Sequence, residues 1–129
     1  MTLEIDELPS AIRAEVAQLA SEVGLSTKEL ADQTAALSPS AQLRLRVGRA
    51  LALRPRVVLA EHPNAELAGT ELSKFARDFA VVVRRRGIAA LVITADAGFA
   101  SAVANRVLEF QASTGALLEK KSGWRRWFS

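Results

Sequence analysis

The sequence limits the chemistry of His62 to a few possibilities, because His62 is the only histidine and the chain has no cysteine. A zinc centre built from several imidazole or thiolate ligands is therefore excluded, and any metal chemistry is magnesium-like. An imidazole with an unperturbed pKa near ~6.5 is mostly neutral at pH 7 and could accept a proton from water. The alternative is that His62 only forms a hydrogen bond at the end of a strand.

The pair Ser38-Pro39 marks a second chemically informative position. Serine is a preferred N-cap, and proline fits the first helical position because its missing N–H needs no partner there. The pair predicts that a helix starts here. A plain helix cap explains it fully, and an anion site at the same helix start is the alternative.

Apolar periodicity and turn residues predict the elements that position these residues. A first helix is expected from Ser10 to Gly24, and a second, short one runs from the Ser26/Glu29 capping box through Ala31. Three more are expected: from Pro39 towards Leu53, from Gly69-Thr70 to Gly87, and over Phe99–Ala104. Continuous apolar runs predict buried strands over Val57–Ala60 and Ala89–Thr94, and a hairpin is expected from residues 106–110 and 116–119.

This order predicts an α/β fold with parallel strands, flanking helices and a carboxy-terminal β-hairpin. Two parallel strands make a small sheet, and such sheets are normally covered on both faces. The chain is therefore expected to form part of a larger core unless another chain completes it.

Composition narrows the class of protein further. Half of the 129 residues are apolar and the net charge is +3, yet four cations lie in the last ten residues. The body thus carries no general electrostatic signature for nucleic acid, and nucleic acid is not expected as a partner. No apolar run reaches the roughly 20 residues of a membrane span, and the acidic start does not resemble a secretory signal, so a cytoplasmic location is expected.

The last residues form a basic aromatic tail, residues 120–129, with Trp124, Trp127 and Phe128 beside the four cations. This mixture suits contact with lipid headgroups, which would place the protein at the inner face of the membrane. It equally suits stacking on nucleic acid, or docking onto a partner or the chain's own core.

Four features in a fixed order resemble the ATP-binding-cassette (ABC) ATPases. The run from Leu37-Ser38-Pro39-Ser40-Ala41-Gln42 through Arg49-Ala50-Leu51-Ala52-Leu53-Arg54-Pro55 to Val57-Val58-Leu59-Ala60-Glu61-His62-Pro63 resembles LSGGQxQR…ARALxxxPxxLLLDEP without a gap. Leu91–Asp96 resembles the strand and switch histidine, and Asn105-Arg106-Val107 resembles the following D-R-V. The order indicates the carboxy-terminal half of an ABC ATP-binding domain, with degenerate motifs, in a partial P-loop NTPase-like fold.

The resemblance implies ATP and Mg²⁺ as the family's cofactors, and another ABC ATPase half or protomer and a membrane permease as partners. It implies a helical subdomain remnant over residues 1–36 and the signature-to-hairpin segment over residues 37–119. Ser38, Ser40 and Gln42 take the signature positions that reach a nucleotide phosphate. Glu61 takes the position of the magnesium-binding aspartate, and His62 that of the catalytic glutamate.

Several family residues are replaced. Pro39 removes one N–H donor from the signature, Ala95 stands where the switch histidine would be, and Ala68 stands where the D-loop aspartate would be. One hypothesis is that His62 substitutes for the lost switch histidine, since neighbouring strand ends lie close together. Glu61 could still hold magnesium through water.

No G-x-x-x-x-G-K-[ST] phosphate cradle occurs in the sequence, so ATP hydrolysis by this chain alone is not expected. Three functions follow. The first is an ABC-type ATP-binding subunit whose phosphate cradle comes from elsewhere. The second is a non-catalytic interaction or adaptor module that docks on an ATPase or membrane partner through its sheet edge. The third is a membrane-surface adaptor that uses the tail.

Overall fold

A left-handed glycine ends the first helix, and a capping side chain begins the second. The computed structural model describes residues 9–120. Helix α1 (Ser10–Val23) ends at Gly24, whose φ of 80° is left-handed, and α2 (Thr27–Ala31) begins at Ser26. Ser26 Oγ accepts from the Glu29 amide at 3.3 Å, and the Ser26 amide donates to Glu29 Oε2 at 2.8 Å, so the predicted capping box is confirmed. A short 3₁₀ turn, η1 (Thr34–Ala36), was not predicted.

Ser38 caps the third helix, α3 (Pro39–Ala52), as the sequence predicts. Its Oγ accepts a hydrogen bond from the Ala41 amide at 3.2 Å, and Pro39 occupies the first turn. The remaining elements follow as β1 (Val57–Glu61), α4 (Gly69–Arg86), β2 (Ala89–Ile93), α5 (Ala97–Val103), β3 (Leu108–Gln111) and β4 (Ala116–Glu119). The α/β fold class is confirmed.

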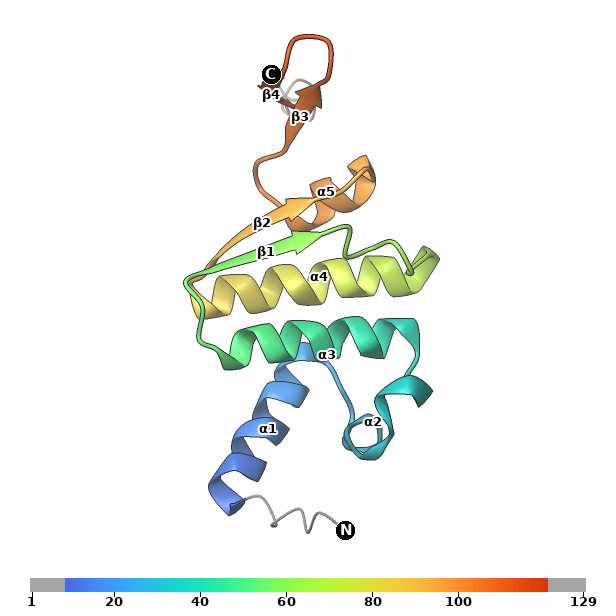
Figure 1. Cartoon of the computed structure of the whole chain (residues 1–129), viewed down its shortest axis with the longest axis vertical. Coiled ribbons are helices and arrows are strands. Elements are labelled where there is room, and N and C mark those ends of the chain that lie inside the picture. The colour runs from blue at the N-terminus through green and yellow to red at the C-terminus, as the bar shows by residue number, and fades with distance from the viewer. Residues whose placement is uncertain (1–8, 121–129) are drawn as a thin grey trace, which may run out of the picture.

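Strands β1 and β2 pair in parallel, from Val57 opposite Ala89 to Glu61 opposite Ile93. Helix α4 makes the connection between them, so β1, α4 and β2 form one β-α-β unit (Figure 1). Strands β3 and β4 form a separate antiparallel hairpin, from Leu108 opposite Glu119 to Gln111 opposite Ala116. Both pairings agree with the sequence prediction.

Two elements, α5 and β3, begin two residues away from the predicted position, while the strands β1 and β2 end within one residue of it. Helix α5 begins two residues before Phe99, because Asp96 Oδ1 accepts from the Phe99 amide at 2.8 Å and caps the helix there. Strand β3 begins at Leu108 instead of residue 106 and extends to Gln111. The start of α5 is set by this side-chain cap, which apolar periodicity does not reveal.

The core consists of two clusters that share α4. One cluster lies among α1, α3 and α4 and contains Ala20, Val23, Leu25, Leu37, Ala41, Leu51 and Val82. The other lies around the first half of α4 and contains Leu43, Leu67, Phe75, Ala76, Phe79 and Phe99. Phe75 stacks against Phe79 and Phe99, with ring centroids 5.8 and 6.3 Å apart. Helix α4 is therefore the element on which both α3 and the sheet are assembled.

One face of the parallel sheet is left open within the described residues. Val58 and Val92 pack against the core clusters, whereas the alternate side chains of both strands point the other way. On that open face Val57, Leu59, Leu91 and Ile93 are 61, 67, 58 and 49% exposed. Apart from Glu61 at the end of β1, the side chains of this open sheet face are apolar, although a parallel sheet is normally covered on both faces. Among residues 9–120, no helix is long and apolar enough to cross a membrane.

Candidate functional site

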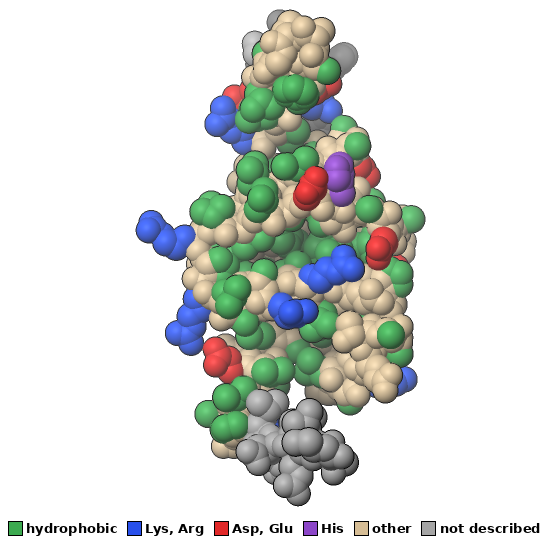
Figure 2. All heavy atoms as spheres, in the orientation of Figure 1, with side chains coloured by type: hydrophobic (Ala, Val, Ile, Leu, Met, Phe, Trp, Pro, Cys, Tyr) green, Lys and Arg blue, Asp and Glu red, His purple; other side chains and the backbone are tan. Residues whose placement is uncertain are grey.

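The predicted chemical residues lie where the two parallel strands end. Glu61 is the last residue of β1, and His62 follows it directly. The His62 amide donates to the carbonyl of Ile93, the last residue of β2, at 2.8 Å. Ligands of parallel α/β sheets bind beyond the carboxyl ends of the strands, so this edge is the expected place for a site. Both Glu61 and His62 are exposed, and Figure 2 shows the histidine side chain at the surface beside an acidic one.

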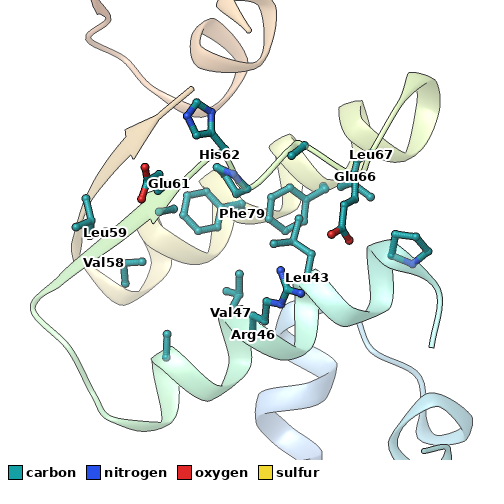
Figure 3. Close-up of a pocket in the computed structure, with 16 residues that line it drawn as sticks. Leu43, Arg46, Val47, Val58, Leu59, Glu61, His62, Glu66, Leu67 and Phe79 are labelled. Atoms are coloured by element: carbon teal, nitrogen blue, oxygen red, sulfur yellow. The ribbon is translucent and has the colours of Figure 1, made fainter. Parts of the chain in front are cut away.

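A cavity of about 250 Å³ lies between α3 and β1, next to this edge. Its walls come from both elements and from the loop after β1, and α4 contributes Phe75 and Phe79. In Figure 3, Leu43, Val47 and Phe79 point into this space, while the His62 imidazole stands away from it, towards the end of β2. The lining is mainly apolar, with charged side chains from Arg46, Glu61 and Glu66. Glu61 and His62 therefore lie at the margin of an apolar cavity.

The signature residues at the start of α3 are engaged locally. Ser38 Oγ accepts from the Ala41 amide, and Gln42 Nε2 donates to the Leu37 carbonyl at 3.0 Å. The structure thus confirms the helix cap, while phosphate binding by Ser38, Ser40 and Gln42 stays a prediction. Pro39 lines the same cavity as Glu61 and His62, whereas Ser38, Ser40 and Gln42 are not among the lining residues.

The two alanines that stand at family positions both lie just outside the regular elements. Ala95 is exposed in the turn between β2 and α5, and Ala68 precedes α4 without a side-chain cap. The backbone contact from His62 to Ile93 confirms that the ends of β1 and β2 are adjacent. The substitution of His62 for the missing switch histidine stays a prediction, since it concerns a bound phosphate.

Sequence reasoning missed the polar contacts that link the two strand ends. Thr94 Oγ1 donates to Asn64 Oδ1 at 2.9 Å, and the Asp96 amide donates to Thr94 Oγ1 at 3.1 Å. An aspartate just before an apolar helical segment is an N-cap signal, and it would have placed the start of α5 correctly. No comparable local signal points to the Asn64–Thr94 contact, because the two residues are thirty positions apart and meet only through the parallel pairing.

The donor set at this edge fits one part of a magnesium–nucleotide site. Within the described residues, no group of three acidic, histidine or cysteine side chains could hold a metal ion. Magnesium is commonly held by one or two carboxylates together with substrate phosphates and water. Glu61 can supply one such carboxylate, and the remaining ligands would have to come from a nucleotide and water. The side chains of residues 9–120 therefore do not form a complete metal site by themselves.

A β-α-β unit with polar residues at the carboxyl ends of parallel strands defines a partial NTPase-like α/β domain. Comparison with known proteins finds two ATP-binding relatives. The chain is 40% identical over 81 residues to the lipoprotein-releasing system ATP-binding protein LolD of Novosphingobium aromaticivorans, a match that covers 63% of this chain and 36% of that protein. It is 33% identical over 72 residues to the glutamate/glutamine/aspartate/asparagine transport ATP-binding protein BztD of Rhodobacter capsulatus, covering 56% and 27% respectively.

The two relatives support the identification of the chain, already indicated by its motifs, as a fragment similar to ABC ATPases. The matched segments span about a third of the length of these curated relatives. The chain matches no protein-family profile.

Proposed function

We propose that this chain forms part of an ABC-type ATP-binding subunit, in which ATP binding and hydrolysis are coupled to transport. The observation that carries the proposal is the position of Glu61 and His62 at the carboxyl end of β1, in the gapless order that resembles the family's magnesium and catalytic positions. The identity with LolD and BztD supports the same assignment. The phosphate cradle, G-x-x-x-x-G-K-[ST], would be supplied by a segment or chain outside these 129 residues.

In this proposal the chain's own residues have separate roles. The Glu61 carboxylate would hold the magnesium ion, whose charge stabilises the triphosphate during transfer to water. The His62 imidazole would orient or deprotonate the attacking water. The start of α3, with Ser38, Ser40 and Gln42, would face the nucleotide held by a second ATPase half or protomer. The partners would be that half and a membrane permease, which places the chain in the cytoplasm at the inner membrane.

ATP turnover by the chain mixed with a P-loop-bearing half of an ABC ATP-binding protein tests this proposal. The chain alone is expected to give no turnover, and the mixture is expected to hydrolyse ATP. Glu61→Gln and His62→Ala are each expected to reduce turnover at least tenfold, which corresponds to about 1.4 kcal/mol of lost transition-state stabilisation. Arg49→Gln, an exposed change on α3, is the matched control. Equal turnover in wild type and both site variants would exclude the assigned roles.

A second candidate is a non-catalytic interaction module. The open sheet face and the two-stranded parallel sheet favour it, because each strand leaves one edge unpaired within the described residues. This candidate predicts that the chain binds the P-loop-bearing half without nucleotide, and that Glu61→Gln and His62→Ala leave the affinity unchanged. Calorimetric titration in the absence of ATP, followed by a turnover assay, separates the two candidates.

The membrane-adaptor alternative depends on the basic aromatic tail, and residues 121–129 lie outside the described residues. Sedimentation with anionic vesicles, with and without residues 120–129, tests it. Binding that requires the tail would support this alternative, and equal recovery of both forms would exclude it.

A further inference from the structure

His62 has a backbone conformation that histidine rarely adopts. Its φ is 43°, in the left-handed region, where the Cβ crowds the backbone of a non-glycine residue. Such residues persist where the surrounding structure determines the backbone, and they cluster at functional sites. Something in the fold must therefore hold the loop after β1 in place.

Two backbone hydrogen bonds fix His62 directly. Its amide donates to the Ile93 carbonyl at 2.8 Å, and its carbonyl accepts from the Ala65 amide at 3.1 Å. The first bond extends the parallel ladder by one residue beyond β1, and the second closes a turn over the next three residues. The first bond requires that the loop stays against the end of β2, and the second fixes the shape of the loop itself.

A side-chain hydrogen bond ties the same loop to β2. Thr94 Oγ1 donates to Asn64 Oδ1 at 2.9 Å, and it accepts from the Asp96 amide at 3.1 Å. The Asp96 N–H can only donate, so the Thr94 hydroxyl proton is free to point towards Asn64. Thr94, Asn64 and Asp96 are all partly buried, which shields this chain of bonds from water.

We propose that Asn64 and Thr94 are positioning residues for His62. Their hydrogen bond holds the loop after β1 against the end of β2, and thereby keeps His62 left-handed with its imidazole at the sheet edge, clear of the apolar cavity (Figure 3). The significance for water activation rests on the proposed function, but the coupling between the contact and the His62 backbone does not.

The test uses the nucleotide-free chain and the fact that His62 is its only histidine, so a single imidazole signal reports on it. In wild type, NMR is expected to show one sharp imidazole signal and the strong NOE between the His62 amide and Cα protons that a positive φ produces. Thr94→Val removes the hydroxyl at nearly constant shape, and Asn64→Leu removes the acceptor. Both are expected to weaken that NOE and to broaden or split the imidazole signal.

Conservative variants provide the matched controls. Thr94→Ser keeps the hydroxyl and Asn64→Asp keeps an acceptor oxygen, so both are expected to retain the wild-type NOE and a single sharp signal. A merely structural role would lower the melting temperature without moving the His62 signals selectively. An unchanged NOE in folded Thr94→Val and Asn64→Leu would overturn the proposal, and so would its absence from wild type.

A second measurement covers the case in which Thr94→Val or Asn64→Leu does not fold. His62→Gly removes the steric cost of the left-handed backbone and is expected to raise the melting temperature by a few degrees. In the His62→Gly background, Asn64→Ala is expected to lower the melting temperature more than in wild type, because no strain is released when the contact is lost. Equal losses in both backgrounds would also overturn the proposal. These outcomes require no ATP turnover, so they stand apart from the proposed function.

Discussion

Arg44 of α3 and Asp78 of α4 form an ion pair, with 2.8 Å between Nη2 and Oδ2, although the Arg44 side chain is only 6% exposed. The same guanidinium donates from Nη1 to the Val23 carbonyl at 2.7 Å and lies 5.9 Å from the centre of the Phe75 ring. Arg44 thus joins the end of α1 to α3 and α4 through three kinds of contact. A buried arginine of this kind is a structural connection between the helices that support the site.

Replacing Arg44 by methionine is expected to destabilise the fold by about 2–3 kcal/mol. The substitution leaves the Val23 carbonyl and the Asp78 carboxylate without their hydrogen-bond partner. Asp78 is 39% exposed and can regain water, which keeps the loss at the lower end for a broken buried pair. Urea denaturation followed by circular dichroism measures the change. Arg49→Met, at an exposed position of the same helix, should change the unfolding free energy by less than about 0.5 kcal/mol.

Gly24→Ala is expected to be more harmful than other glycine substitutions at helix ends. A Cβ there would lie 2.5 Å from Arg44 Nη1, and the φ of 80° is left-handed. Gly87 also ends a helix with a positive φ, but a Cβ at Gly87 meets nothing within 4 Å. Gly87→Ala should therefore cost about 1 kcal/mol for the backbone alone, and Gly24→Ala at least twice that. Similar losses in the two variants would show that the contact with Arg44 relaxes freely.

The bidentate pair between Glu22 and Arg86 predicts a loss of stability in acid. Both guanidinium contacts are 2.6 Å long, and the hydrogen bond from Arg86 lowers the pKa of the Glu22 carboxyl below its ordinary value. A lowered folded-state pKa contributes stability above the unfolded pKa of about 4.3, and that stability is lost as the pH falls through the folded pKa. The melting temperature should therefore decrease once the pH is below about 4.3. Glu22→Gln should flatten this dependence, and an unchanged slope would contradict the prediction.

The pKa of the capping carboxylate of Glu29 is also lowered. Its hydrogen bonds from the Ser26 amide and hydroxyl lower the pKa of Glu29. Glu29→Gln keeps one capping acceptor while removing the charge, so it is the companion variant to Glu22→Gln in the acid melts. The double variant should show less dependence on pH than either single variant.

The open sheet face should contribute little to the stability of the isolated chain. Leu59 and Leu91 are 67 and 58% exposed, so Leu59→Thr with Leu91→Thr should change the unfolding free energy by less than about 0.5 kcal/mol. Light scattering should show less self-association of this variant, because an exposed apolar patch has been removed. Phe79→Ala, at a side chain with 6% exposure, should by contrast cost about 3–5 kcal/mol. A large loss in the double threonine variant would mean that this face is covered in solution.

Much of the fold was predictable, because its elements are set by local signals. The capping residues Ser26 and Ser38, the stop at Gly24 and the apolar runs of β1 and β2 each specify a conformation within a few residues. Helical spacing also places Arg44 on the same face of α3 as the buried Ala41 and Leu51. Its burial was nevertheless not predicted, because a charged side chain is normally exposed.

The site was predictable only in part. Glu61 and His62 were placed correctly because a strand end depends on local sequence, and the resemblance gave them roles. The left-handed φ of His62 and the contact between Asn64 and Thr94 depend on how two distant segments meet. Neither follows from spacing along the chain, since each arises from the register of β1 against β2.

Among residues 9–120, strands β3 and β4 pair with each other and with no other strand. Their Leu108, Phe110, Leu117 and Leu118 are 42, 64, 62 and 47% exposed. A two-stranded hairpin with so little burial is marginally stable by itself. Its amide protons should therefore exchange with solvent orders of magnitude faster than those of α4, which both core clusters share. Opening of β3 and β4 would then require little free energy and would leave Glu61 and His62 in place, because the hairpin is a separate sheet.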